Sequence, residues 1–303
     1  MEPSPGPAPA PPPHVVGVLA VAVLAISSAA VLVRAIGPAV HPLALAFWRT
    51  LGIAVLLAPA VRRVSRRDAA RIALAGVCLA GHFATWFGSL QTLGVLRSTV
   101  LVCLGPLWTG FLEWTFLRRR PSAIFFVGLL LALPGIALLT GSDPGPDSLQ
   151  GDALALLGGM LGAAYLVLGR SVRARVGIGT YASLVCAAAA AALAPAVVLA
   201  HVPLVGFAPR TWALIAALAV GPQLLGHNGF NYALRWLPAA TVASVTILEP
   251  VGATVLAAIF LGERPGPLAI LGGVLAVAGV YGATRRPGAA WAGSTRRLPR
   301  PPG

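Results

Sequence analysis

One basic side chain lies inside an otherwise apolar segment of the sequence. Arg49 follows Pro42 by seven residues, which places it roughly 10 Å into that segment if the segment is helical. In a membrane, a charge at this depth costs about 2.5 to 3.5 kcal/mol on insertion scales, so it must face protein or water. The planar guanidinium can hold a carboxylate or a phosphate through two hydrogen bonds. Two roles for Arg49 stay open: binding of an anionic group, and a structural contact with carbonyl groups of a neighbouring helix.

An acidic side chain occupies a similar position near the other end of the chain. Glu249 lies about eleven residues into another apolar segment and directly precedes Pro250. Because Pro250 has no amide hydrogen, the carbonyl group of Thr246 loses its helical partner and the helix should kink. Pro106 predicts the same break at Val102 in an earlier segment. Paired breaks at one depth predict a central cavity, where ligands, ions or water meet the freed carbonyl groups.

Two interpretations of Glu249 also stay open. Burial disfavours the ionised form of a carboxyl group, so Glu249 could bind and release a proton and thereby couple the protein to a proton gradient. Alternatively, Glu249 forms an ion pair with Arg49 that only orders helix packing. A further acid, Glu113, lies near the end of its segment, within reach of Arg118 to Arg120, and we interpret it as structural.

Two histidines complete the set of candidate residues. His82 and Trp86 are four residues apart and share a helix face, as His227 and Asn231 do later in the chain. Both histidines lie near the middle of their segments, and Asn228 flanks the second pair. We weigh cavity lining against ordinary packing for these side chains. No carboxylate or Cys accompanies either His at ligand spacing, so we expect no metal and no cofactor.

These residues must be positioned by helices that cross a membrane. Of the 303 residues, 57% are hydrophobic and only 10% are charged, and the mean hydropathy is +0.85. The apolar residues form blocks of about 18 to 25 residues, which is the length that a helix needs to span a bilayer. This pattern excludes a soluble domain and predicts an all-α integral membrane protein. The ten predicted spans are 15–33, 41–60, 70–91, 94–117, 122–140, 151–169, 180–200, 210–234, 238–261 and 266–284.

The net charge of +14 would ordinarily suggest a nucleic-acid partner. All 22 basic residues are arginines, however, and nearly all lie in short connections between apolar blocks, where they set orientation. We therefore expect no nucleic-acid partner. The connection with Arg62, Arg63, Arg66, Arg67 and Arg71 should be cytoplasmic, and most other arginines fall on the same side. Both termini are then cytoplasmic, and the Lys-free composition indicates a bacterial inner or plasma membrane.

The second half of the chain repeats the first. A shift of 144 residues lays Leu93 to Thr140 over Leu237 to Thr284 without a gap and pairs Pro106 with Pro250. The glycine pairs are Gly128 with Gly272 and Gly135 with Gly279. Each half has five spans, an odd number, so the second half must enter the membrane from the opposite side. Inverted repeats of this kind are typical of transporters with two alternating states around one site.

Residues 15 to 284 resemble the EamA-type, ten-helix members of the drug/metabolite transporter superfamily. The resemblance rests on Ile247-Leu248-Glu249-Pro250-Val251 through Ala257-Ala258-Ile259-Phe260-Leu261-Gly262-Glu263, and on Phe47-Trp48-Arg49. The first half departs from the family pattern at Arg118-Arg119-Arg120, where the family often has a second Gly-Glu. The resemblance implies two five-helix repeats and the movement of amino acids, other metabolites or drugs, usually outward.

The predicted organisation has five parts: a disordered Pro-rich tail (1–14), a first five-helix repeat (15–141), an acidic extracytoplasmic linker (142–150), a second repeat (151–284) and a basic cytoplasmic tail (285–303). We expect a secondary active exporter of a small metabolite such as an amino acid, working by alternating access around a midplane cavity. Proton coupling and a homodimer are compatible with the sequence. Efflux of drugs or cationic compounds is the alternative, followed by a scaffold or sensor. Only eight acidic residues are present and the connections hold no cluster of them, so we do not expect an enzyme.

Overall fold

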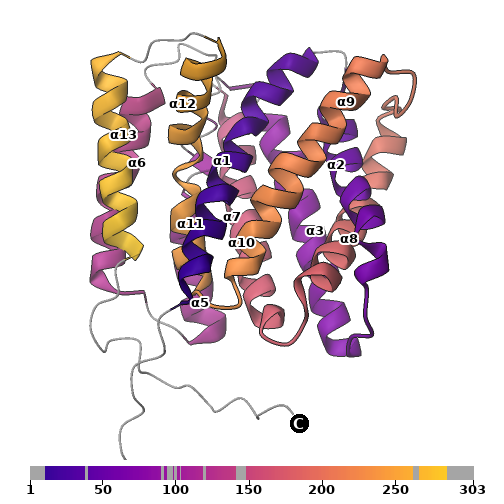
Figure 1. Cartoon of the computed structure of the whole chain (residues 1–303), viewed down its shortest axis with the longest axis horizontal. Coiled ribbons are helices and arrows are strands. Elements are labelled where there is room, and N and C mark those ends of the chain that lie inside the picture. Colours follow the sequence, from indigo (N-terminus) through magenta and orange to yellow (C-terminus); the bar gives the residue numbers. More distant parts are fainter. Residues whose placement is uncertain are drawn as a thin grey trace, which may run out of the picture.

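The computed structural model is a bundle of helices, most of which run along one common direction (Figure 1). It describes residues 11–37, 40–89, 92–93, 98, 101–102, 104–118, 121–140, 148–261 and 266–284. Within these residues the backbone forms helices, turns and irregular connections but no strand. They make ten passes through the bundle, which confirms the predicted all-α fold of two five-pass halves.

The first half contains α1 (Pro13–Ile36), α2 (Pro42–Leu56), the short η2 (Ala58–Ala60), α3 (Arg66–Ser89), α5 (Gly105–Leu117) and α6 (Ala123–Thr140). The second half contains α7 (Leu149–Arg173), α8 (Ile178–Leu199), α9 (Pro209–Leu218), η3 (Ala219–His227), α10 (Asn228–Ala233), α11 (Ala239–Thr246), α12 (Glu249–Leu261) and α13 (Pro267–Thr284). The third pass of the second half is built from α9, η3 and α10, and the fourth from α11 and α12.

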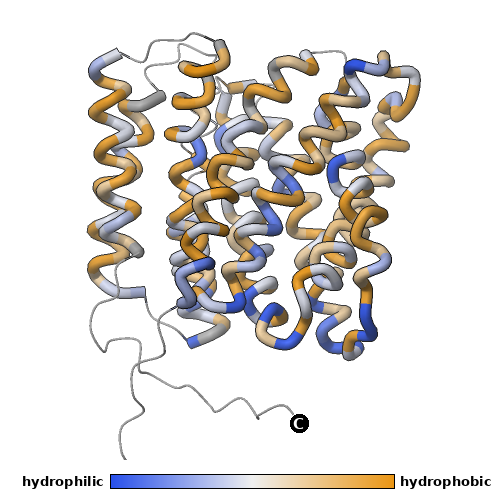
Figure 2. The backbone as a smooth tube through the Cα atoms, in the orientation of Figure 1, coloured by the Kyte–Doolittle hydropathy of each residue, from blue (hydrophilic) through white to orange (hydrophobic). Residues whose placement is uncertain are grey.

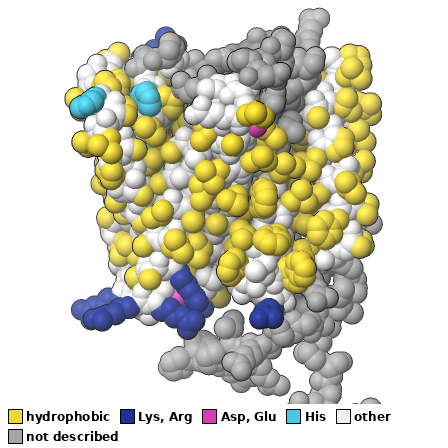
Figure 3. Space-filling view, turned by 180° about the vertical axis from the view of Figure 1, so that it is seen from behind, with side chains coloured by type: hydrophobic (Ala, Val, Ile, Leu, Met, Phe, Trp, Pro, Cys, Tyr) yellow, Lys and Arg dark blue, Asp and Glu magenta, His cyan; other side chains and the backbone are white. Residues whose placement is uncertain are grey.

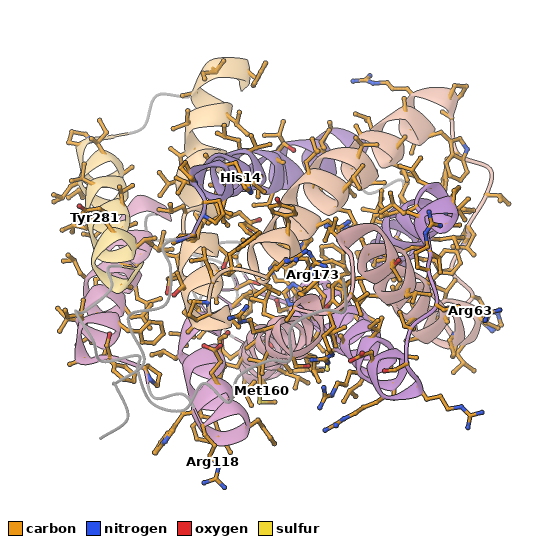
Figure 4. All side chains as sticks on the ribbon, turned by 60° about the horizontal axis from the view of Figure 1, so that its bottom comes forward. His14, Arg63, Arg118, Met160, Arg173 and Tyr281 are labelled. Atoms are coloured by element: carbon orange, nitrogen blue, oxygen red, sulfur yellow. The ribbon has the colours of Figure 1, made fainter. Side chains whose placement is uncertain are left out.

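The surface of the bundle suits a lipid bilayer. Among the described residues, five helical stretches are each long and apolar enough to cross a membrane. Hydrophilic residues of the described chain concentrate at the lower end of Figure 2, and Figure 3 shows arginines gathered at that end below a broad hydrophobic surface. Arg63 and Arg118 come forward there when this end is turned toward the viewer (Figure 4). An apolar belt with an arginine-rich end is the arrangement expected of a multi-pass membrane protein.

The two halves enter the bundle from opposite ends. The start of α1 and the end of α13 both lie at the lower end in Figure 1. Five passes separate the start of α1 from the end of α6, so α7 begins the second half from the upper end. The repeat is therefore inverted, as the odd number of predicted spans per half required.

Local chemistry explains where several helices begin. Pro13 stands in the first turn of α1, and Pro42 and Pro209 open α2 and α9, because a proline has no amide hydrogen to lose at the first helical position. Two residues that we assigned to the N-terminal tail, Pro13 and His14, are therefore helical. Helix α3 also begins earlier than predicted, because the Ser65 hydroxyl accepts from the backbone N–H of Asp68 at 3.1 Å and caps the helix.

Two of the predicted spans are interrupted, one beside Pro250, where we expected a kink, and one that we predicted as continuous. Residues 210–234 contain the π-helical segment η3, which includes Pro222, and a proline removes one hydrogen bond from a helical ladder. Residues 238–261 are divided between α11, which ends at Thr246, and α12, which begins at Glu249. Both interruptions contain or adjoin a proline, and both lie next to candidate functional residues.

Helices α6 and α13 form a closely packed pair at one side of the bundle (Figure 1). A Cβ atom on Gly128 would lie 2.5 Å from the carbonyl oxygen of Gly279, and one on Gly135 would lie 2.8 Å from that of Gly272. The repeat pairs Gly128 with Gly272 and Gly135 with Gly279, so it maps each of these two contacts onto the other. Without a hydrophobic force between helices in lipid, such small residues allow the close backbone contact that holds helices together.

Glu113 joins the two halves at the arginine-rich end. Its carboxylate oxygens accept from the backbone N–H groups of Ala239 and Ala240 at 2.9 and 3.0 Å, and the side chain is only 1% exposed. The first N–H groups of a helix have no partner within the helix and carry a partial positive charge. The Glu113 carboxylate of α5 therefore caps the start of α11. This role is structural, as we expected, and its partners are the first N–H groups of that helix.

The glycine contacts between α6 and α13 predict that Gly279→Ala destabilises the protein. Its Cβ atom would lie 2.6 Å from the carbonyl oxygen of Gly128, so the helices must separate, with an expected loss of about 1 to 3 kcal/mol. Thermal unfolding in detergent measures the effect. Gly282→Ala on the same helix is the matched control, because the nearest atom to its Cβ would be the Cα of Gly128 at 3.7 Å. Equal unfolding temperatures for the two variants would contradict this account of the packing.

Candidate functional site

The Arg49 side chain is buried in the bundle and only partly satisfied. It is 1% exposed, and its Nε donates a hydrogen bond to Oε1 of Gln223 at 3.0 Å. The central carbon of the guanidinium lies 4.3 Å from the centre of the Phe83 ring, a cation–π arrangement. The Nη2 atom is buried and has no hydrogen-bond partner among the described residues. The guanidinium is thus held on one edge and can still donate to an acceptor.

Gln223 holds Arg49 because η3 places it in the interior. The side chain is fully buried, and its Nε2 donates to the sulfur of Cys186 at 3.6 Å. The widened turn of a π-helical segment changes which residues face inward, and such segments are frequent at functional sites. Our sequence analysis missed Gln223. A glutamine beside Pro222 inside an apolar segment was the signal that could have found it.

The structure brings the two candidate histidines together. The ring centres of His82 and His227 are 6.4 Å apart, and His227 lies 5.4 Å from Phe83, the ring beneath Arg49. Nδ1 of His82 lies 2.8 Å from the carbonyl oxygen of Gly158. Because a carbonyl oxygen accepts, Nδ1 carries the hydrogen, and Nε2 of a neutral ring remains an acceptor. The histidines therefore belong to the same cluster as Arg49.

Trp86 extends the cluster along α3. Its ring stacks on His82 with 5.9 Å between ring centres, as the four-residue spacing predicts. The indole nitrogen is buried and has no partner in the described part of the chain. Like Arg49, Trp86 presents an unused donor within a largely apolar interior.

Asn228 and Asn231 lie on α10 beside a tyrosine that we had not considered. Asn231 donates from Nδ2 to the hydroxyl of Tyr165 and, at 3.2 Å, to Oδ1 of Asn228. The Tyr165 ring centre is 6.4 Å from that of His227, so these amides adjoin the histidines. The backbone carbonyl of Asn231 also accepts from Nε of Arg173 at 2.9 Å, which fixes α10 against α7. Arg173 is labelled in Figure 4, in the interior of the bundle.

Glu249 begins α12 directly after the interruption. Its backbone carbonyl accepts from the Ser27 hydroxyl at 2.9 Å. Its half-buried carboxylate has no hydrogen-bond or ion-pair partner within the described residues, although its charge interacts with that of Arg49. The ion pair that we considered is therefore not formed in this conformation. Within the described residues, no hydrogen bond or ion pair joins Glu249 to Arg49, and Nη2 of Arg49 keeps an unused donor.

The two expected helix breaks border this cluster. Pro250 adjoins the interruption between α11 and α12, beside Glu249. In the first half, Val102 is helical, Leu104 forms a turn and α5 begins one residue before Pro106. Val102 packs against Gly159 of α7: a Cβ atom on Gly159 would lie 3.0 Å from the Val102 carbonyl oxygen. Gly159 is next to Gly158, whose carbonyl oxygen contacts His82.

Within the described residues, no three His, Cys, Asp or Glu side chains gather as metal ligands do.

Comparison with known proteins identifies similar chains over most of the length. Residues 15–141 and 149–285 match the profile of the EamA-like transporter family. The threonine/homoserine exporter RhtA of Escherichia coli (strain K12) is 30% identical over 282 residues, which cover 88% of this chain and 90% of RhtA. A probable terminal-alkyne amino-acid exporter of Streptantibioticus cattleyicolor is 27% identical over 252 residues, covering 78% of this chain and 80% of that protein. A solved crystal structure with 21% identity covers 89% of this chain and 96% of its own, with a TM-score of 0.75, and so shows the same fold.

The bond between Arg49 and Gln223 predicts strongly coupled stability effects. Gln223→Leu leaves Nε of a buried guanidinium without an acceptor, and we expect a loss of about 1.5 to 3 kcal/mol. In the double variant Arg49→Leu/Gln223→Leu no unpaired charge remains, so it should be less destabilised than the sum of the single variants. Thermal unfolding of the four proteins in detergent gives the coupling. Additive effects would mean that Gln223 does not support Arg49.

Proposed function

Because the chain belongs to the EamA-like transporter family, we propose that it exports small amino acids, which bind at the buried cluster around Arg49. A transporter in this family carries a small molecule through the membrane, and the exporters among the relatives agree with an outward direction. The amino-acid cargo and the binding site are our proposal.

The partly satisfied guanidinium of Arg49 carries the proposal. The Nε atom of Arg49 donates to Gln223, while its Nη2 atom is buried without a partner among the described residues. A substrate carboxylate would supply the missing acceptor and a negative charge, and charge-assisted hydrogen bonds to a carboxylate are about twice as strong as neutral ones. The Phe83 ring and the Gln223 amide already orient the guanidinium, so little ordering remains to be done when a substrate binds.

Glu249 supplies the complementary charge. An amino acid carries an ammonium group beside its carboxylate, and the Glu249 carboxylate is free of hydrogen bonds and ion pairs within the described residues. The two charges are close enough to interact and do not neutralise each other by contact. A zwitterion placed between them would satisfy both. The names of two relatives, a threonine/homoserine exporter and a probable amino-acid exporter, support this substrate class.

We further propose that the two inverted halves alternate between inward-open and outward-open states. Pro106 and Pro250 stand at repeat-related positions, and beside Pro250 the pass is divided between α11 and α12. Breaks of this kind let a helix bend without losing its remaining hydrogen bonds. By the arginine distribution, the end with Arg63 and Arg118 would face the cytoplasm. The start of α1 and the end of α13 lie at that end (Figure 1).

Arg49→Lys should reduce amino-acid export at least tenfold. A lysine keeps the charge but loses the planar pair of donors and the bond to Gln223. The measurement is efflux of radiolabelled amino acids and of cationic dyes from loaded proteoliposomes, with and without a proton gradient. Arg210→Gln, an exposed arginine at the start of α9, is the matched control and should transport normally.

The outcomes of this assay separate the candidate functions. Amino-acid efflux that falls in Arg49→Lys, but not in Arg210→Gln, supports the proposal. Efflux of dyes alone would replace it with efflux of cationic compounds, for which the rings of Phe83 and Trp86 in the cluster offer cation–π contacts. Unfolding curves of both variants in detergent show whether a loss of transport reflects a loss of structure.

Glu249→Gln tests proton coupling. Glutamine keeps the shape of the side chain but cannot take up and release a proton, so a pH gradient should no longer accelerate efflux. Exchange of labelled for unlabelled amino acid without a gradient should continue at a reduced rate. It requires no net proton movement, and the glutamine oxygen still accepts from the ammonium group, although without a charge. Gradient-driven efflux at the wild-type rate would rule out Glu249 as the coupling group.

A further inference from the structure

Two buried amide groups on α10 retain unused bonding capacity. Asn228 and Asn231 are 4% and 0% exposed, and a hydrogen bond from Asn231 Nδ2 to Asn228 Oδ1 joins them at 3.2 Å. Nδ2 of Asn228 and Oδ1 of Asn231 are buried, and neither has a partner in the described part of the chain. One donor and one acceptor therefore remain in a pair of side chains that hold each other side by side.

One donor and one acceptor remain whichever way the oxygen and nitrogen of the two Asn amides are assigned. If both amides are turned over, Asn228 donates to Asn231, and the Tyr165 hydroxyl donates to Asn231 as well. One donor and one acceptor are again left, now Nδ2 of Asn231 and Oδ1 of Asn228. A bond between two amides uses one donor and one acceptor, and Tyr165 adjusts to either arrangement because a hydroxyl can donate or accept.

The amide pair is continuous with the cluster that holds Arg49. Phe83 lies under the guanidinium, His227 lies 5.4 Å from Phe83 and 6.4 Å from Tyr165, and Tyr165 binds Asn231. The Tyr165 hydroxyl and the Arg49 charge are close enough to interact electrostatically. The amide pair thus adjoins the cluster that holds Arg49, and a subsite there requires that the side chain of a molecule bound to Arg49 reaches it beside His227 and Tyr165.

We propose that Asn228 and Asn231 form a subsite for a hydroxyl group on the side chain of the transported amino acid, an inference that rests on the proposed function. A hydroxyl oxygen donates and accepts through a single atom, so its chemistry complements one leftover donor and one leftover acceptor. A methyl group of the same size satisfies neither and leaves two buried polar atoms unpaired. Sites built to bind a hydroxyl therefore reject the analogue that lacks it. The exporter should prefer threonine to valine, and serine to 2-aminobutyrate, although each pair has nearly the same shape.

The test measures discrimination rather than rate. Proteoliposomes are loaded with radiolabelled threonine or valine, and the ratio of their initial efflux rates is compared among variants. We expect the wild type to prefer threonine by about tenfold or more, in line with the effect of leaving buried polar groups unpaired. Asn228→Leu has a similar shape and no polar group, so its ratio should fall close to one, mainly because threonine efflux falls.

The control variant is Tyr232→Phe on the same helix. The Tyr232 hydroxyl lies 3.1 Å from Nε2 of His14, away from the amide pair, so its removal should leave the ratio unchanged. Asn228→Leu is preferred to a change at Asn231, whose amide also binds Tyr165. A ratio near one in a folded wild type that exports both amino acids overturns the subsite but keeps the proposed function. A wild-type ratio retained in Asn228→Leu also overturns the subsite, and export of neither amino acid by folded protein overturns both proposals.

Discussion

A guanidinium in the interior of a membrane protein has to be satisfied by the protein, and Arg49 shows how this chain does so. Its Nε bonds to Gln223, and its face lies on Phe83, so α2, α3 and η3 must meet at one point. Small residues also bring η3 and α10 close to α1. A Cβ atom on Gly226 would lie 3.1 Å from that of Ile26, and one on Gly229 would lie 2.8 Å from that of Ala22, which shows how closely η3 and α10 approach α1. The cost of burying one charge thus sets the packing of the central helices.

The helices that surround Arg49 form one apolar cluster, and the pair α6 and α13 forms most of another. The largest buried apolar cluster joins residues of α1, α2, α3, α7, α8 and α10, whereas a second cluster lies between α6, α13 and parts of α11. Glu113 bonds to the start of α11, at the border of these two groups. The break beside Pro250 borders the second group, because Ile247 is buried in that group and Leu248 and Val251 pack against it. The glycine contacts between α6 and α13 lie there as well. They hold these two helices together and involve neither Arg49 nor Gln223.

The sequence predicted more of the fold than of the site, for physical reasons. Block length alone predicts ten passes, because a bilayer has one thickness. Polarity within apolar blocks identified Arg49, Glu249, His82 and His227, since a buried polar group is costly wherever it lies. Contacts depend instead on side-chain direction, which the break before Glu249 and the π-helical turn at Gln223 both change. Of the two interpretations of Glu249, the ion pair with Arg49 is not formed in this conformation. The partner of Arg49 is Gln223, whose inward direction depends on the π-helical turn.

The break between α11 and α12 lies between two anchors. At one end the Glu113 carboxylate holds the first N–H groups of α11, and at the other the Ser27 hydroxyl holds the carbonyl group of Glu249. Pro250 removes a hydrogen bond at the break itself, so bending there leaves the remaining helical bonds intact. In the proposed cycle, a change of angle at this point moves Glu249 relative to Arg49, which α2 and η3 hold in place. In that cycle, a substrate or a proton bound by Glu249 would change its interaction with the Arg49 charge and so alter the preferred angle at the break.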